Sequence, residues 1–237
     1  MLRLEHLFQR LDLLVSRDEP VDHHFALATI FEVMDVASRA DLKSDLLKEL
    51  DRHRTQLSAF RGHPGISEAA LDEVTGRIDG VFAGLNQLQG KAGHALASND
   101  WLMSIRSRIS IPGGTCEFDL PAYYAWQQHP AQKRRADLRG WMVTLTPLAQ
   151  ALTVLLGLLR DGGAVQRMLA PGGNYQQSLA NGKAYHLLRV WIDRETGLVP
   201  EITGHRLMVT VRFMKPDAEG RLRSAGSDTA FELALCV

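Results

Sequence analysis

The segment of residues 106–121, RSRISIPGGTCEFDLP, constrains the fold of this chain more than any other. It places Pro112, Gly113 and Gly114 between two stretches that contain β-branched residues, a pattern that predicts a β-hairpin with a tight glycine turn. The sequence around it has helical periodicity for the first two thirds of the chain. We therefore expect an α+β protein in which residues 107–120 form a hairpin inserted into a helical domain.

Apolar residues recur at spacings of three and four along the N-terminal part, as they do on amphipathic helices. The pattern predicts a first helix over about residues 4–15 and a second that starts with Asp22 as its N-cap after Pro20. A third helix is predicted over about residues 42–60, before the helix-ending Gly62.

A fourth helix is predicted to start at Ser67 and to carry Gly76, Gly80 and Gly84 on one face. Each glycine costs a helix about 1 kcal/mol relative to alanine. Three at intervals of four are tolerable where another backbone comes close, so the pattern favours close helix packing at this ridge. The ridge is a candidate surface for packing within the chain or for dimerisation.

Two further helices are predicted, one from about Ala131 and one from Thr146 to the glycine pair at 162–163, and then the pattern changes. Residues 171–175 have the composition of a mobile linker. The strands are predicted to follow in one antiparallel sheet together with residues 107–120. Asn181–Gly182 has the composition of a two-residue hairpin turn, and the predicted strands cover residues 185–193, 207–214 and 229–236.

The predicted domain organisation follows from this order of elements. A helical domain of about six to eight helices would contain residues 1–106 and 121–163, and a β domain residues 107–120 and 174–237.

Composition and charge limit the classes of function. The chain has 237 residues, 45% of them apolar, and a net charge of zero. The charge balance is −5 over residues 1–100, +4 over 101–160 and +1 over 161–237. This distribution does not indicate a general nucleic-acid binder, but it allows a local basic patch that faces an acidic partner. No signal peptide or membrane span is evident, which predicts a cytoplasmic location.

Motifs for catalysis, metal binding and nucleotide binding are absent from the sequence. The histidines lack metal-ligand spacing, and the glycine pairs fit neither the phosphate-binding loop nor the dinucleotide fingerprint. Pairs of catalytic carboxylates stay open, although solvated helix faces account for the many acidic residues. We predict no enzyme activity, catalytic residue, metal site or cofactor. Cys116 and Cys236 are the only cysteines and are expected to be two buried, reduced thiols.

Arginines on the predicted strands suggest a binding surface. In residues 206–214, Arg206 and Arg212 lie on the face opposite the apolar one, and Arg189 has the corresponding place in residues 185–193. Arg106 and Arg108, at the start of the predicted hairpin, extend this basic surface. Guanidinium groups pair with carboxylates and stack on apolar groups, which suits a short acidic and hydrophobic peptide. Solvated arginines on the wet face of a sheet are the alternative.

The run Lys133-Arg134-Arg135 at a predicted helix start is a further basic feature. Positive charge there opposes the helix dipole, which an external anion or partner would compensate. A solvated run of charge is the alternative. This run motivates the second functional hypothesis, a nucleic-acid-binding regulator, and the neutral overall charge argues against that hypothesis.

Several segments of this chain resemble the ZapD family, bacterial division factors that bind the tubulin-like protein FtsZ. The resemblance extends from Arg3-Leu4-Glu5 to Phe231-Glu232-Leu233-Ala234 and is densest at residues 106–121, 43–52 and 145–148. It implies a non-catalytic homodimer with a helical domain and a β domain. Such a dimer would bind the C-terminal tail of FtsZ, cross-link protofilaments and be recruited to the division site at midcell.

The resemblance also suggests tail-binding residues. Arg3, Arg39 and Arg212 retain the arginine expected in the family. Trp101 and Tyr124 stand where relatives can have a basic residue and a histidine, and Met208 replaces a further arginine, which would make the site less basic and more aromatic. The full predicted partner-binding set is Arg3, Arg39, Trp101, Arg106, Arg108, Tyr124, Arg189, Arg206 and Arg212.

Family members usually have a strand upstream of the block at which this chain starts. We therefore expect Met1 to be an internal methionine of the natural gene and the sheet to lack one strand.

Overall fold

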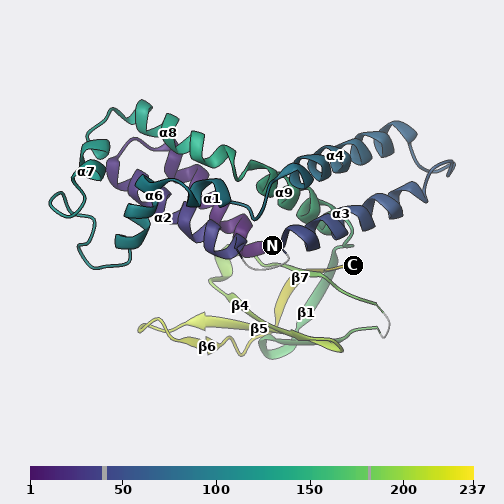
Figure 1. Cartoon of the computed structure of the whole chain (residues 1–237). Coiled ribbons are helices and arrows are strands. Elements are labelled where there is room, and N and C mark those ends of the chain that lie inside the picture. Colours follow the sequence, from purple (N-terminus) through teal and green to yellow (C-terminus); the bar gives the residue numbers. More distant parts are fainter. Residues whose placement is uncertain (39–41, 181–182) are drawn as a thin grey trace. The chain divides into compact units, whose positions relative to one another are not determined.

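The structure is a computed structural model that describes residues 1–38, 42–180 and 183–237. Helices come first along the chain and strands follow, as the colours of Figure 1 show. The chain divides into two compact units, unit 1 from Met1 to Leu155 and unit 2 from Leu156 to Val237. The predicted α+β class is confirmed. The helices are α1 (Leu2–Ser16), α2 (Pro20–Ala37), α3 (Leu42–Ser58), α4 (Glu68–Gln87), α5 (His94–Ala97), α6 (Asp100–Arg108), α7 (Pro121–Gln127), α8 (Ala131–Val143) and α9 (Thr146–Asp161).

Helices α1 and α2 form an antiparallel pair in the core of unit 1. The stripe predicted for the first helix is buried in α1, at Leu4, Leu7, Leu11 and Val15. Helix α2 begins at Pro20, so the predicted N-cap at Asp22 is wrong. Proline is favoured at this first position because its missing N–H would have no partner within the helix.

Helices α3 and α4 pack as a second pair. Their buried apolar residues are Leu46 and Leu50 of α3, four positions apart, and Leu71, Ile78 and Leu85 of α4, seven positions apart. Ser67 caps α4 as predicted, since its hydroxyl accepts a hydrogen bond from the Ala70 amide. The glycine ridge, Gly76, Gly80 and Gly84, does not pack as expected. A Cβ built at each of the three positions would meet no other described atom within 4 Å, so the predicted close helix contact is not found among the residues that the structure describes.

The hairpin predicted at residues 107–120 is wrong. Helix α6 runs on to Arg108 because Leu102 and Ile105 are buried at helical spacing, and the residues up to α7 form consecutive turns without a strand. Gly113 has a φ of 70°, and a Cβ on Gly114 would come within 2.7 Å of the Arg108 carbonyl oxygen. The glycines therefore serve a compact turn, and this segment belongs to unit 1 and not to the sheet of unit 2.

Unit 2 contains two antiparallel sheets in place of the single predicted sheet. One has the order β1-β7-β3, and the other has the order β2-β5-β4, with β6 also paired to β5. The linker predicted at 171–175 is instead a short 3₁₀ turn, Pro171–Gly173, that leads into β2. The predicted Asn181–Gly182 turn lies outside the described residues. The strands are β1 (Gln166–Ala170), β2 (Asn174–Ser178), β3 (Leu187–Trp191), β4 (Val199–His205), β5 (Met208–Pro216), β6 (Leu222–Ser224) and β7 (Thr229–Cys236).

The apolar core of unit 2 lies between the two sheets. Strand β5 contributes Val209, Val211 and Phe213 to it, and β7 contributes Phe231 and Leu233. This confirms the alternation predicted for residues 206–214, in which Arg212 falls on the outward face. Because sheets bury one face and expose the other, the register fixes which side chains can meet a partner.

The two cysteines are both free thiols. Cys236 is buried as expected, whereas Cys116 is only partly buried.

Among the described residues, no single helix is long and apolar enough to cross a membrane. Helices α8 and α9 reach that length and composition only together, as a pair bent by 69°.

Candidate partner-binding surfaces

Trp101 lies in an aromatic cluster of unit 1. Its ring stacks on Trp141 at 5.4 Å between centroids and contacts Trp126 at 5.6 Å and Tyr123 at 6.1 Å, both edge-on. These rings come from α6, α7 and α8, which therefore pack through them. Aromatic pairs of this geometry add about 0.5–1.5 kcal/mol beyond the area they bury. The cluster gives Trp101 a structural role, and its contact with a partner stays a prediction.

Tyr124 and its neighbour Tyr123 have opposite environments. Tyr124 is 45% exposed and its ring is available to a partner, whereas Tyr123 is buried and its hydroxyl lies 2.8 Å from Nδ1 of His24. Burial raises the pKa of Tyr123 and lowers the pKa of His24, because each charged form would lose its hydration. Of the two adjacent tyrosines, Tyr124 is thus the one that is accessible to a partner, as predicted for a binding residue.

The predicted arginines of unit 1 differ in their partners. Arg106 forms an ion pair with Asp35 of α2, and Arg108 lies 3.8 Å from a carboxylate oxygen of Asp119. Arg3 is exposed and has no acidic partner within the described ranges. Arg39 lies outside the described residues.

The basic run at the start of α8 is not a patch of free charge. Arg134 is only 4% exposed and donates hydrogen bonds to Nδ1 of His23 at 2.9 Å, to the Gln127 carbonyl at 2.9 Å and to the carbonyls of Asp18 and His129. Arg135 forms an ion pair with the Asp18 side chain. Arg134 is therefore not a solvated charge, as the alternative interpretation of the run required. Because Arg134 is buried and Arg135 is paired, the run gives little support to nucleic-acid binding.

Unit 2 holds the other three predicted arginines. Arg212 of β5 projects from the outward face and lies 3.8 Å from Glu201 on the neighbouring strand β4, with its side chain 60% exposed. Arg189 is committed locally, since its guanidinium lies 4.3 Å from the Trp191 ring centre and donates to the Arg160 carbonyl at 3.1 Å. Arg206, between β4 and β5, is exposed and lines a cavity of about 390 Å³.

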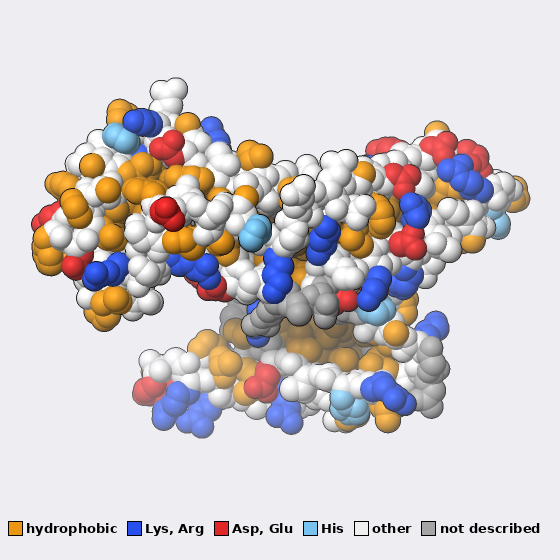
Figure 2. Space-filling model, viewed as in Figure 1, with side chains coloured by type: hydrophobic (Ala, Val, Ile, Leu, Met, Phe, Trp, Pro, Cys, Tyr) orange, Lys and Arg blue, Asp and Glu red, His pale blue; other side chains and the backbone are white. Residues whose placement is uncertain are grey.

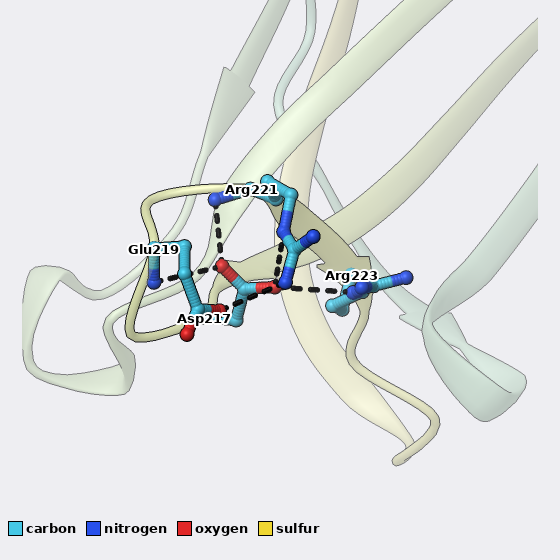
Figure 3. Close-up of polar contacts among 4 residues, drawn as sticks. All are labelled: Asp217, Glu219, Arg221 and Arg223. Atoms are coloured by element: carbon cyan, nitrogen blue, oxygen red, sulfur yellow. Dashed lines mark hydrogen bonds and ion pairs between the residues drawn. The ribbon is translucent and has the colours of Figure 1, made fainter.

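The turn between β5 and β6 forms a charged cluster that the sequence analysis missed (Figure 3). The Asp217 carboxylate accepts hydrogen bonds from the backbone amides of Glu219 and Arg221, and the guanidinium groups of Arg221 and Arg223 each lie 3.2 Å from its Oδ2. Desolvation would raise the pKa of Asp217, but these hydrogen bonds together lower it. Asp217 thereby holds both arginine side chains and stabilises the turn. An aspartate whose side chain can accept a hydrogen bond from the backbone amide two residues later is a known turn signal, and Asp217 could have been recognised from the sequence in this way.

Charge gathers near this turn on the face shown in Figure 2, where Lys and Arg side chains lie along the β5–β6 end of unit 2. Lys215 and Arg223 are directly opposite each other in the β5–β6 register. Like charges opposite one another destabilise a sheet, and Asp217 offsets this repulsion. Of this group, Lys215 has no acidic partner in the part of the chain that the structure describes.

The predicted set therefore divides between two units and does not form one site within either. Arg106, Arg108 and Arg212 face carboxylates, Arg189 is stacked, and Arg3 and Arg206 are without an acidic partner among the described side chains. Within the described residues, no group of three or more His, Cys, Asp and Glu side chains is placed to hold a metal ion.

Known proteins resemble this chain along its whole length. Residues 2–212 match the family model "ZapD: Cell division protein". The chain is 50% identical to the "Cell division protein ZapD" of Ralstonia pickettii (strain 12J) and 48% identical to that of Ralstonia nicotianae. Each similarity covers all 237 residues of this chain and 94% of the relative. The resemblance seen in the sequence is thereby confirmed, and the chain belongs to the ZapD family of cell division proteins.

Proposed function

We propose that this chain is a non-catalytic cell division factor that binds the C-terminal tail of FtsZ and, as a homodimer, cross-links FtsZ protofilaments at midcell. The observation that carries the proposal is membership of the ZapD family over the full length of the chain. The names of the relatives specify cell division alone, so the FtsZ tail, the dimer and the bundling are proposed for this chain.

The arginine of the outward sheet face supports an acidic partner. Arg212 and Glu201 are both well exposed and their charged atoms are 3.8 Å apart, so their ion pair is worth only about 0–1 kcal/mol. A carboxylate of a bound peptide can replace Glu201 at little cost. An arginine can then hold that carboxylate through two parallel hydrogen bonds.

Cross-linking requires two tail sites on one particle. A protein with a single site would coat a filament without joining it to another, whereas a dimer with two sites gains from the high effective concentration of the second tail. We therefore expect the active form to be a homodimer. Light scattering coupled to size-exclusion chromatography would give its mass, and a monomer at working concentrations would contradict this part of the proposal.

Bundling of FtsZ polymers tests the function itself. Purified chain should increase light scattering and the pelleted mass of GTP-assembled FtsZ, and should leave FtsZ that lacks its C-terminal tail unbundled. Equal bundling of both FtsZ forms would contradict tail binding.

Variants on the sheet face sharpen this assay. Arg212→Glu should weaken bundling, while Arg194→Glu, at an exposed site on the turn after β3, makes the same change in net charge as a control. Glu201→Gln should strengthen binding, because it frees the guanidinium of Arg212. If Arg194→Glu weakens bundling as much as Arg212→Glu, the effect comes from net charge and not from this face.

A nucleic-acid-binding role is the alternative that the same protein can test. Because Arg134 is buried and Arg135 is paired, we expect only weak binding to duplex DNA. Tight duplex binding that falls steeply with salt would favour the alternative.

A further inference from the structure

A cavity of about 390 Å³ lies within unit 2 where its two sheets meet segment 183–187. Its floor is apolar and comes from both sheets, with Leu188 and Leu235 on one side and Leu179 and Val209 on the other. Of these, Leu179, Leu188 and Leu235 are only partly buried and pack against the core of the unit. The cavity is thus an open end of the core, at the lower end of the roughly 300–1,000 Å³ that small-ligand pockets occupy.

Basic groups surround this apolar floor. Lys183, His186, His205 and Arg206 all line the cavity and are all exposed, and no Asp or Glu is among the described residues that line it. Lys183 and Arg206 have no acidic partner in the described part of the chain, unlike Arg212, which faces Glu201. Their charge is therefore available to a ligand without breaking an existing ion pair.

The combination selects one chemistry. An apolar side chain that enters the cavity would cover the exposed parts of the leucines, at roughly 25 cal/mol for each Å² of apolar surface removed from water. Carboxylates beside that side chain would meet Lys183 and Arg206 at the rim. An anion without an apolar group would leave the apolar floor in contact with water. A neutral apolar ligand would form no ion pair with Lys183 or Arg206.

We infer that this cavity is the anchor site for an acidic peptide, which inserts one apolar side chain and pairs its flanking carboxylates with Lys183 and Arg206. The inference rests on the proposed function, because it takes that peptide to be the C-terminal tail of FtsZ. The cavity would be a second contact region, in addition to the outward face of β5. The family resemblance did not indicate its residues, and the strand pattern indicated only Arg206.

Two variants separate the charged rim from the apolar floor. Arg206→Glu reverses a rim charge, with Arg194→Glu as the matched control. Ala184→Trp plugs the cavity from an exposed position outside any helix or strand, with Ala218→Trp, in the exposed β5–β6 turn, as the control for adding an indole. Because neither 184 nor 206 is a core position, both variants should keep the circular dichroism spectrum and melting temperature of the wild type.

Fluorescence anisotropy with a labelled FtsZ C-terminal tail peptide is the measurement. Arg206→Glu and Ala184→Trp should each raise the dissociation constant at least about tenfold, a change of 1.4 kcal/mol, and the two controls should not. The loss in Arg206→Glu should shrink as salt is added, whereas the loss in Ala184→Trp should persist. In methyl NMR spectra, the peptide should shift resonances of Leu188 and Val209 but not those of Leu50 in unit 1.

The outcomes distinguish the two proposals. Wild-type affinity in both variants, with no shift at Leu188 or Val209, would overturn the cavity as the anchor site and leave FtsZ binding in place. Failure of the wild-type chain to bind the tail would overturn both. A cavity that is filled by a second copy of this chain would reveal itself as Ala184→Trp lowering the dimer mass, and this also contradicts the inference.

Discussion

Replacing the three glycines of the α4 ridge with alanine should stabilise the chain by about 3 kcal/mol. Gly76, Gly80 and Gly84 lie inside the helix, where alanine is favoured over glycine by about 1 kcal/mol per residue. A Cβ at each position meets no other atom within 4 Å, so no steric cost opposes this gain. For a chain of this size, the sum corresponds to an increase in melting temperature of about 6–12 °C.

Thermal and urea unfolding followed by circular dichroism at the helix band would measure the effect in the single and triple variants. Ala83→Gly is the matched control, since this exposed alanine of the same helix should lose about 1 kcal/mol when it is replaced. Size-exclusion light scattering on the same samples would report association. A triple variant that is no more stable than the wild type would contradict this prediction. Loss of a dimer in the triple variant would indicate that the ridge packs against another chain.

Three further predictions concern unit 1. Arg134→Ala should lower the free energy of unfolding by about 3 kcal/mol in urea titrations, because it leaves buried acceptors such as the Asp18 carbonyl without a donor. The pKa of His23 is lowered by burial and by nearby Arg134, so the folded state favours the neutral histidine. The free energy of unfolding should therefore be highest above pH 6.5 and fall as the pH drops below that value. His23→Gln should flatten this pH dependence. A rise in stability between pH 7 and pH 5.5 would contradict that sign. Gly114→Ala should cost about 1–3 kcal/mol in thermal melts, since its Cβ would lie 2.8 Å from Cβ of Ile111.

Local periodicity predicted much of the fold. The stripe of α1, the Ser67 cap of α4 and the alternation of β5 each depend on residues close in sequence, and each is found in the structure. Strands β1, β2, β4 and β6 were missed because each is short or lacks a clear alternation of apolar and polar residues. Strand β2, for example, reads Asn-Tyr-Gln-Gln-Ser, with Tyr175 packed against the core. Partners far along the chain stabilise such strands, and local patterns do not record those partners.

The segment at 106–121 shows how tertiary packing overrides a local pattern. Its β-branched residues and glycine pair fit a hairpin, but Leu102 and Ile105 bury one face of α6 and carry the helix to Arg108. After that point, Gly114 fits where a side chain would collide with the Arg108 carbonyl. Residue preferences contribute less here than the burial of two apolar side chains.

The candidate site was harder to predict than the fold. The sequence identifies arginines, but whether each is available depends on distant partners: Arg134 bonds to His23, 111 positions away, and Arg106 pairs with Asp35, 71 positions away. Arg206 differs from these because no acidic side chain in the described residues reaches it. An available charge beside an apolar cavity can only be recognised once the fold places both.

A titration of the purified chain against a labelled FtsZ C-terminal tail peptide, at low and at physiological salt, tests the proposed function most directly. We expect saturable binding that weakens as salt screens the charged contacts, and that weakens further in Arg212→Glu. No saturable binding at either salt concentration would contradict the claim that this ZapD family member is an adaptor for the FtsZ tail.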